Sequence, residues 1–269
     1  IKRDINSGYL PEKSGHTHLK RYMKSPLGLQ MRLQRTLLVS FACGLFLLGL
    51  SYGSIFGTLD TFFEDNPLLK QMLNGKGDNY AEQFLPTLMV VMAMVATIPT
   101  LISLFRFKTD NQHGYTLMLL ANPMTRLTYF SSYIILSIIN AIIMIFLASL
   151  GLYIGQYFVM AQPLSLFSVI TSGVIYIPAI LTFVALGILV LGVSNNLTSI
   201  VYGYLAYCFV VVYLGNLLNV REWLKNLTPF HHIPQIPIDD FTVLPLLILI
   251  ILTVFITVCG LLLFQRKDL

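Results

Sequence analysis

The stretch that most constrains this chain lies between Arg126 and Arg221, where 94 consecutive residues carry no lysine, arginine, aspartate or glutamate. A water-soluble surface has roughly a quarter or more of its residues charged, whereas only 11% of this chain is charged and 56% is hydrophobic. A helix crosses the hydrocarbon core of a bilayer with about 20 residues. We therefore predict an all-α integral membrane protein in which this stretch crosses the membrane several times.

The charged residues divide the chain into apolar stretches that are long enough to span a bilayer. Turn-forming residues at 161–163 and 192–196 divide the 94-residue stretch further. Pro178 lies inside the fourth predicted span, and it predicts a kink, because each half alone would be too short to cross. The six predicted transmembrane helices are 36–58, 84–105, 130–158, 164–193, 197–218 and 241–264.

The basic residues predict the orientation, because lysine and arginine accumulate in cytoplasmic segments. With both termini inside, the cytoplasmic segments hold 13 Lys/Arg and 4 Asp/Glu, whereas the outer segments 59–83 and 219–240 hold 4 and 8. We therefore predict a multi-pass protein of the plasma membrane with cytoplasmic termini. This sidedness explains the net charge of +5 without a nucleic-acid partner.

Residues 1–35 are predicted to be a cytoplasmic linker followed by an interfacial elbow helix, which Ser25 and Pro26 would begin. The alternation of residues 27–34 has the period of a strand, but a lone strand beside a bilayer has no partner. The alternative is an ordinary basic flank of the first span. The basic residues expected at the lipid headgroups are Lys20, Arg21, Lys24, Arg32 and Arg35.

The two ends of the chain resemble each other: residues 2–5 (KRDI) and 266–269 (RKDL) both have two basic residues, an aspartate and an aliphatic residue. This similarity, together with the start at Ile1, predicts one half of a longer protein with a tandem duplication and twelve spans.

Two connecting segments have helix signals of their own. Thr109 and Asp110 can cap a short cytoplasmic helix, about 110–121, which Pro123 would end. Such a helix either passes force from a soluble partner into the membrane or lies on the bilayer surface. On the outer side, Trp223 and the proline-rich residues 228–237 predict a segment that dips into the interface. The pair His231 and His232 has no metal-ligand spacing, so no metal site is predicted.

Several motifs resemble one family. These are residues 3–11 (RDINSGYLP), 25–29 (SPLGL), 33–35 (LQR), 65–67 (DNP), 114–126 (GYTLMLLANPMTR), 222–223 (EW), 228–234 (TPFHHIP) and 266–269 (RKDL). They are similar to motifs of the permeases of type-2 ATP-binding-cassette exporters, and among these to the C-terminal half of the two-repeat polyketide-antibiotic or multidrug exporter permeases. Asp110, Asn111 and Gln112 depart from the family, which tends to carry glutamates there.

The resemblance implies a transporter complex with several components. It implies a permease subunit that exports an amphipathic compound, such as an antibiotic, drug or lipid-like molecule, by alternating access, in a bacterial cell. The partners would be cytoplasmic ATP-binding-cassette ATPase subunits, a second permease half and membrane lipid. This chain has no glycine-rich phosphate loop, so it would not itself be an enzyme and would need no cofactor. ATP and magnesium would bind the partner ATPase.

The resemblance also assigns roles to residues of this chain. The predicted outer re-entrant residues are Trp223, Pro229, Phe230, His231 and Pro234. The predicted coupling residues are Asp110, Gln112, His113, Gly114, Tyr115, Leu119, Leu120, Pro123 and Arg126. Spans two and five would line the substrate path, through Met89, Met92, Met94, Tyr204 and Tyr207. For each of these five, helix packing or an interfacial tyrosine belt is the alternative.

The residues of the predicted spans bear on the other possible classes of membrane protein. An ion-coupled transporter usually has an ionisable residue within the bilayer, and the six predicted spans have none. Asn140 places an amide side chain deep within a predicted span, and we expect it to form a hydrogen bond between helices rather than to take part in chemistry. Gly49, Gly53 and Gly57 predict close helix packing. A membrane scaffold needs no motif, so it stays the alternative to an export permease.

Overall fold

The structure, a computed structural model, describes residues 25–58, 80–113, 125–215, 220–239 and 241–266. Every regular element in these residues is helical. The long helices are α1 (Pro26–Ile55), α4 (Tyr80–Gln112), α6 (Arg126–Val159), α8 (Ile177–Val193) and α11 (Val243–Arg266). The shorter elements are η2 (Phe56–Thr58), α7 (Leu166–Val174), η3 (Asn195–Leu197), α9 (Thr198–Tyr213), α10 (Glu222–Asn226) and η4 (Pro229–His232).

Five helices within the described residues are long and apolar enough to cross a membrane: Pro26–Thr58, Ala81–Gln112, Arg126–Val159, Leu166–Val193 and Val243–Arg266. The prediction of a helical membrane protein is confirmed at this level. The fifth predicted span, 197–218, corresponds to α9, which has 16 residues. At 1.5 Å per residue, α9 is about 24 Å long, less than the roughly 30 Å of the hydrocarbon core. Six complete crossings therefore stay a prediction.

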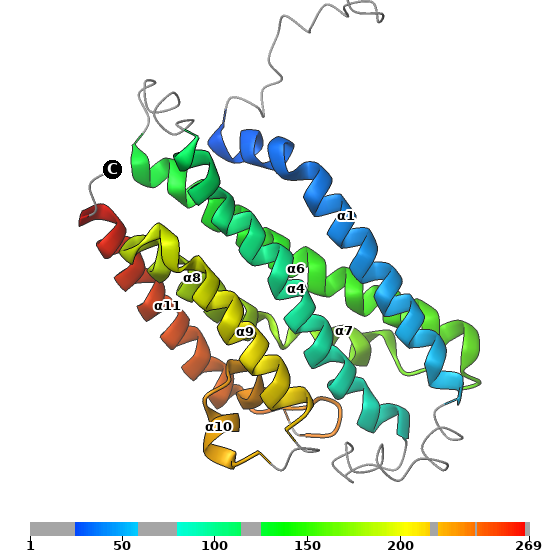
Figure 1. The fold of residues 1–269 in the computed structure, drawn as a ribbon. Coiled ribbons are helices and arrows are strands. Elements are labelled where there is room, and N and C mark those ends of the chain that lie inside the picture. The colour runs from blue at the N-terminus through cyan, green and yellow to red at the C-terminus, as the bar shows by residue number, and fades with distance from the viewer. Residues whose placement is uncertain (1–24, 59–79, 114–124, 216–219, 240, 267–269) are drawn as a thin grey trace, which may run out of the picture.

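The long helices run side by side as a bundle (Figure 1). The start of α1, the end of α4, the start of α6 and the end of α11 lie at one end, which we call the terminal end. The short helix α10 lies at the opposite end, which we call the far end. This arrangement agrees with the division of the connecting segments into two sides that the sequence predicts.

The helix α4 lies at the centre of the bundle. It packs between α6 and α8, while α1 packs along α6 and α11 packs along α8. Of the most apolar window of α4, 78% is buried, compared with 17% for α1 and for α11. The outer helices therefore present apolar side chains to the surroundings, as lipid-facing helices do.

Side-chain caps begin three of the α-helices. The Ser25 hydroxyl accepts a hydrogen bond from Gly28 N at 3.1 Å, which confirms the predicted helix start. Thr125 caps α6 through Thr128 N at 3.2 Å, and Ser165 caps α7 through Ser168 N at 3.1 Å. The fourth predicted span is interrupted between α7 and α8, and Pro178 lies in the first turn of α8. The predicted kink is thus a short break in the helix, placed where proline is best tolerated.

The predicted elbow and the first span form one helix. α1 runs without interruption from Pro26 to Ile55, so residue 35 is not a helix boundary. The buried face of its first turns is polar: Gln30 is 0% and Gln34 is 2% exposed, whereas Met31 is 43% exposed. Met31 and Leu33 are therefore exposed, and the two glutamines face the bundle.

Glycines bring α1 and α6 into backbone contact toward the far end. A methyl group on Gly49 would overlap the carbonyl oxygen of Ala148, and one on Gly53 would overlap that of Leu152. Gly151 and Gly155 meet the backbone of α1 in the same way, at Phe46 and Leu50. The prediction of close packing at Gly49 and Gly53 is confirmed, and its cause is the absence of a side chain at these positions.

Candidate functional site

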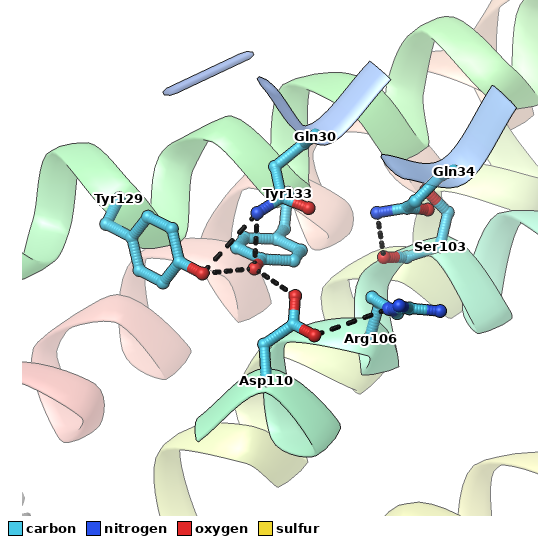
Figure 2. A network of polar contacts seen from close by, with 7 residues as sticks. All are labelled: Gln30, Gln34, Ser103, Arg106, Asp110, Tyr129 and Tyr133. Carbon is cyan, nitrogen blue, oxygen red and sulfur yellow. Dashed lines mark hydrogen bonds and ion pairs between the residues drawn. The ribbon is translucent and has the colours of Figure 1, made fainter. Parts of the chain in front are cut away.

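A buried group of polar side chains joins three helices at the terminal end. We call Gln30, Gln34, Ser103, Arg106, Asp110, Tyr129 and Tyr133 the polar cluster (Figure 2). They come from the first turns of α1, the last turns of α4 and the first turns of α6. Within each helix the polar residues include a pair four apart, and such pairs share one helix face.

Tyr133 is the centre of the polar cluster and is 0% exposed. Its hydroxyl donates to Asp110 Oδ2 at 2.7 Å. A phenol has one proton, so Tyr133 O must act as the acceptor toward its other neighbours. Tyr129 OH lies 2.5 Å away, and Gln30 Nε2 donates at 2.6 Å. The hydrogen bonds therefore run in one direction, from α1 and Tyr129 through Tyr133 to the carboxylate.

Asp110 receives this chain of hydrogen bonds and is 4% exposed. Its Oδ1 accepts a hydrogen bond from Arg106 Nε at 3.3 Å, one helical turn earlier. The Arg106 side chain is 44% exposed, so the ion pair joins a buried carboxylate to the surface of the bundle. A buried carboxylate is stable when paired and hydrogen-bonded, and Asp110 has both kinds of partner. Asp110 thus links the end of α4 to α6.

Gln34 makes a second link between α1 and α4. Its Nε2 donates to the backbone carbonyl of Ser103 at 3.4 Å. Three buried atoms of the polar cluster have no hydrogen-bond partner among the described residues: Gln30 Oε1, Gln34 Oε1 and Ser103 Oγ. Each unpaired polar atom costs free energy in an apolar setting. The α1 side of the polar cluster is therefore held less firmly than the Tyr133–Asp110 side.

Aromatic rings surround the polar cluster and bring in α11. Phe107 packs edge-on against Tyr133, with ring centroids 5.4 Å apart, and against Phe264 at 5.5 Å. Phe264 also stacks on Phe130 at 4.2 Å, and the Arg126 guanidinium lies 5.7 Å from the Phe264 ring. Four helices therefore meet where the connection between α4 and α6 begins and ends.

Comparison with known proteins decides the family. A family model described as "Multidrug efflux system permease Rv1217c, C-terminal domain" matches residues 23–265. The chain belongs to this family. A relative, the multidrug efflux system permease protein Rv1217c of Mycobacterium tuberculosis, is 26% identical over 270 residues. The match covers 99% of this chain and 49% of the relative, so the chain spans about half the length of that protein. The predicted resemblance to the C-terminal half of a multidrug exporter permease is confirmed.

In this member of the Rv1217c C-terminal domain family, four of the predicted coupling residues lie in or next to the polar cluster. Asp110 and Gln112 lie in the last turn of α4, His113 follows it, and Arg126 begins α6. The prediction of a separate helix starting at Asp110 is wrong at that point, because α4 continues through Asp110 with its side chain already paired. The other predicted coupling residues lie outside the described residues: Gly114, Tyr115, Leu119, Leu120 and Pro123.

Of the five predicted elbow residues, two lie within the described residues and three lie outside them. Arg32 and Arg35 lie on the exposed side of α1, in its second and third turns. Lys20, Arg21 and Lys24 lie outside the described residues. Their assignment to the headgroup region stays a prediction.

The residues predicted to line a substrate path belong to the packed interior of this half or pack against it. Met89 and Met92 are 0% exposed and Met94 is 2% exposed, and all three lie in the core of this half. Tyr204 OH donates to the carbonyl of Leu227 at 2.7 Å, and Tyr207 OH donates to that of Leu224 at 3.0 Å. The two tyrosines thus hold the outer segment against α9 in this conformation. These hydrogen bonds could not be predicted from the sequence, because their acceptors are backbone atoms.

The outer segment is folded against the far end. Pro229 and Phe230 are buried, Pro234 is buried as well, and Trp223 is 62% exposed. Phe230 packs on Phe183 of α8, with ring centroids 5.6 Å apart. The pKa of His231 is lowered from its ordinary value by partial desolvation, and then by the nearby charges of His232 and Lys225. Within the described part of the chain, no group of three His, Cys, Asp or Glu could hold a metal ion.

The polar cluster includes residues that sequence reasoning missed: Gln30, Gln34, Ser103, Tyr129 and Tyr133. A signal was present. Gln30–Gln34, Arg106–Asp110 and Tyr129–Tyr133 are three polar pairs with a spacing of four, each near the same end of an apolar helix. Because polar side chains at this spacing share a helix face, the three pairs together indicate a polar contact between helices.

Proposed function

We propose that this chain is the transmembrane permease half of an ATP-driven exporter that moves amphipathic compounds out of the cell by alternating access. The observation that carries the proposal is the match of residues 23–265 to the C-terminal domain of a multidrug efflux permease. The relative is about twice as long, which supports a second permease half in the same polypeptide or in another subunit. ATP and magnesium would be bound by separate cytoplasmic ATP-binding-cassette ATPase subunits.

The terminal end is the side that we assign to the cytoplasm and to the ATPase. The excess of basic residues in its connecting segments supports this orientation. The predicted coupling residues, from Asp110 to Arg126, would contact the ATPase. The polar cluster supports this role, because it joins both ends of that connection to α1 at distances of 2.5 to 3.4 Å. Motion of the connection would then reach α1, α4 and α6 together.

The substrate path stays part of this proposal and requires a second conformation. Tyr204 and Tyr207 would become available when the outer segment leaves α9, since their hydroxyls now bind its carbonyls. Met89, Met92 and Met94 would become available when α4 repacks. Thioethers and phenols form an adaptable, weakly polar wall that suits varied amphipathic ligands.

The test uses the complete permease, purified under mild conditions from the membranes of its own host. Mass spectrometry identifies the subunits that co-purify, and ATP hydrolysis is then measured in lipid nanodiscs with and without amphipathic drugs. We expect an ATP-binding-cassette ATPase to co-purify and at least one drug to change its rate of hydrolysis. If no ATPase co-purifies and no drug has an effect, the scaffold alternative replaces this proposal.

Coupling is tested by replacing residues in the connecting segment. Gly114→Leu or Pro123→Ala should lower the amount of compound exported per ATP hydrolysed, without reducing membrane insertion. Leu47→Ala, on the exposed face of α1, is the matched control and should leave that ratio unchanged. Unchanged export in both connecting-segment variants would remove the coupling assignment while leaving the exporter itself in place.

A further inference from the structure

A pocket opens between α1 and α6 on the outer surface of the bundle. Its volume is about 200 Å³ and its accessible wall is apolar throughout. Met31, Leu38 and Val39 line it from α1, and Ile139, Asn140 and Ile143 line it from α6. Val39 is 61% and Ile143 is 44% exposed, so these residues form the rim. Asn140 is 2% exposed, and its Nδ2 is buried without a hydrogen-bond partner among the described residues, so the accessible wall that a bound molecule meets is hydrocarbon.

The position of the pocket follows from how the two helices contact each other. Toward the far end, Gly49 and Gly53 bring the backbones of α1 and α6 together. Toward the terminal end, Gln30 reaches across to Tyr133. The stretch between these two contacts has neither glycine against backbone nor a bridging polar side chain, and the pocket lies there. An apolar cavity of this size has room for more than a benzene ring, which fits in about 150 Å³.

A basic residue lies on the pocket side of α1. Arg35 is four residues from Met31 and four from Val39, and residues at this spacing share one helix face. It is exposed, and it forms no ion pair with the residues that the structure describes. Because side chains in a helix tilt toward its start, the guanidinium extends toward the terminal end. A long basic side chain near the end of a membrane helix can reach the headgroup region.

The charge around the mouth of the pocket is positive. Arg32 lies next to Arg35 on the exposed surface of α1. Among the residues that the structure describes, the acidic residue at the terminal end is Asp110. It is buried and paired with Arg106. A molecule that fills the pocket and extends toward Arg35 therefore needs an apolar chain and an anionic head. Guanidinium groups bind phosphate through parallel hydrogen bonds.

We propose that the α1–α6 pocket and Arg35 form a binding site for one anionic phospholipid. An acyl chain fills the pocket and the phosphate lies against Arg35, with Arg32 beside it. The surroundings supply this ligand, because both helices are long and apolar enough to cross the bilayer and the pocket opens away from the core. The lipid would join α1 to α6 between the polar cluster and the glycine contacts.

The experiment uses the complete permease in nanodiscs of phosphatidylcholine and phosphatidylglycerol. A phosphatidylglycerol probe with a photoreactive acyl chain is activated by light, and the labelled peptides are identified by mass spectrometry. We expect label on residues 31–42 and 136–144. Val39→Trp fills the pocket and should reduce this labelling at least fivefold. Leu47→Trp adds the same bulk to the exposed face of α1, where Leu47 is 60% exposed, and should have no effect.

The headgroup is tested separately. A phosphatidylcholine probe with the same photoreactive chain gives the ratio of anionic to neutral lipid at the site. Arg35→Gln should reduce this ratio about fivefold, the effect of one basic residue near an anionic surface. Arg266→Gln, which removes a basic residue of α11 at the terminal end, is the control and should leave the ratio unchanged.

Several outcomes would overturn the proposal. One is equal labelling by the two probes in the unmodified protein, which indicates ordinary surrounding lipid. Another is labelling that neither Val39→Trp nor the milder Ile143→Phe reduces, when both variants keep the melting temperature of the unmodified protein. Crosslinks from this surface to another protein segment would assign the pocket to a protein partner. None of these measurements involves ATP or transport, so they are independent of the exporter proposal.

Discussion

Tyr133 has one proton to donate and three polar neighbours to satisfy. Its proton goes to Asp110, and its oxygen accepts from Gln30 and Tyr129. The direction of the whole chain of hydrogen bonds therefore depends on this single hydroxyl. A residue in this position holds three helices together through one oxygen atom.

We expect Tyr133→Phe to destabilise the permease by about 1–3 kcal/mol, because it leaves the buried Asp110 Oδ2 without its phenol donor and the Gln30 amide with only its longer hydrogen bond to Tyr129 OH, at 3.4 Å. Thermal unfolding of the complete permease in detergent measures this change. Tyr157→Phe is the matched control, since Tyr157 is 58% exposed. Equal melting temperatures for the Tyr133 and Tyr157 variants would contradict the role given to the polar cluster.

A second expectation concerns pH and His231. The pKa of His231 lies below its ordinary value of 6.5, so the folded outer segment favours the neutral ring. Below about pH 6.5 the unfolded chain binds this proton more readily, and stability falls as the pH falls. Above that pH the ring is neutral in both states and contributes no pH dependence.

The measurement compares melting temperatures at pH 7.5 and pH 5.5 for the unmodified permease and for His231→Gln. We expect the loss on acidification to be smaller in the variant. The control is His113→Gln, at the other end of the bundle, which should keep the full loss. An identical loss in all three proteins would show that His231 does not sense this change.

At the scale of elements, the pairing of α1 with α6 depends on two kinds of contact. Glycines allow the backbones to touch near the far end, and polar side chains join the helices near the terminal end. Helices in a membrane gain little from the hydrophobic effect between them, so close van der Waals packing and hydrogen bonds are what hold them together.

We expect Gly53→Ala and Gly151→Ala each to cost about 1–3 kcal/mol, because the added methyl group meets the backbone of the partner helix. Gly44→Ala is the matched control on the same helix, where a methyl group would meet nothing within 4 Å. Alanine also favours helix over glycine by up to about 1 kcal/mol. Thermal unfolding should therefore show lower melting temperatures for Gly53→Ala and Gly151→Ala and a higher one for Gly44→Ala. A loss of stability in Gly44→Ala would refute this explanation.

How far the sequence predicts these elements depends on which physical signal carries the information. Long apolar stretches identify the helices, because crossing a bilayer requires about 20 apolar residues whatever the neighbours are. The cap at Ser25 follows from local chemistry, and Pro178 marks the place where the fourth span is interrupted, although a kink was predicted there rather than a break. The buried face of α1 does not follow from local chemistry, since its two glutamines bind partners that are 103 and 69 residues away in the sequence. Such partners cannot be identified from one helix alone.

The place of the candidate site was predictable from the sequence, but among its members only Asp110 was predicted. Asp110 and Arg126 mark the ends of the connection, and both lie at the site. Tyr133 lies inside the third predicted span and Tyr129 directly precedes it, where a phenol is also a common interfacial residue. The methionines of α4 suggested a ligand wall, but the packing of α4 at the centre of the bundle buries them.

At the scale of the whole molecule, the two ends of the bundle differ in their chemistry. The terminal end carries Arg32, Arg35, Arg106 and Arg126, whereas the far end carries the folded outer segment with Trp223. A difference of this kind predicts the orientation of the protein in its membrane.

We expect a cysteine at His113 to face the cytoplasm and a cysteine at Trp223 to face outward. Each is introduced into a permease from which Cys43, Cys208 and Cys259 have been removed, and intact cells are treated with a membrane-impermeant maleimide. Trp223→Cys should be labelled in intact cells, and His113→Cys only after the cells are opened. The reverse pattern would invert the topology, and labelling of both in intact cells would contradict the assignment of the two ends to opposite sides.

The glycine contacts between α1 and α6 lie far along α1 from Gln30, so a tilt of α1 about these contacts would be amplified at the Gln30 end. Gly49 and Gln30 are 19 residues apart on one helix, which corresponds to about 28 Å at 1.5 Å per residue. If the glycine contact is the fulcrum, a tilt of about 10° moves the Gln30 end by about 5 Å, close to one helical turn. A small rotation where two backbones touch would then be enough to part the hydrogen bonds at the opposite end.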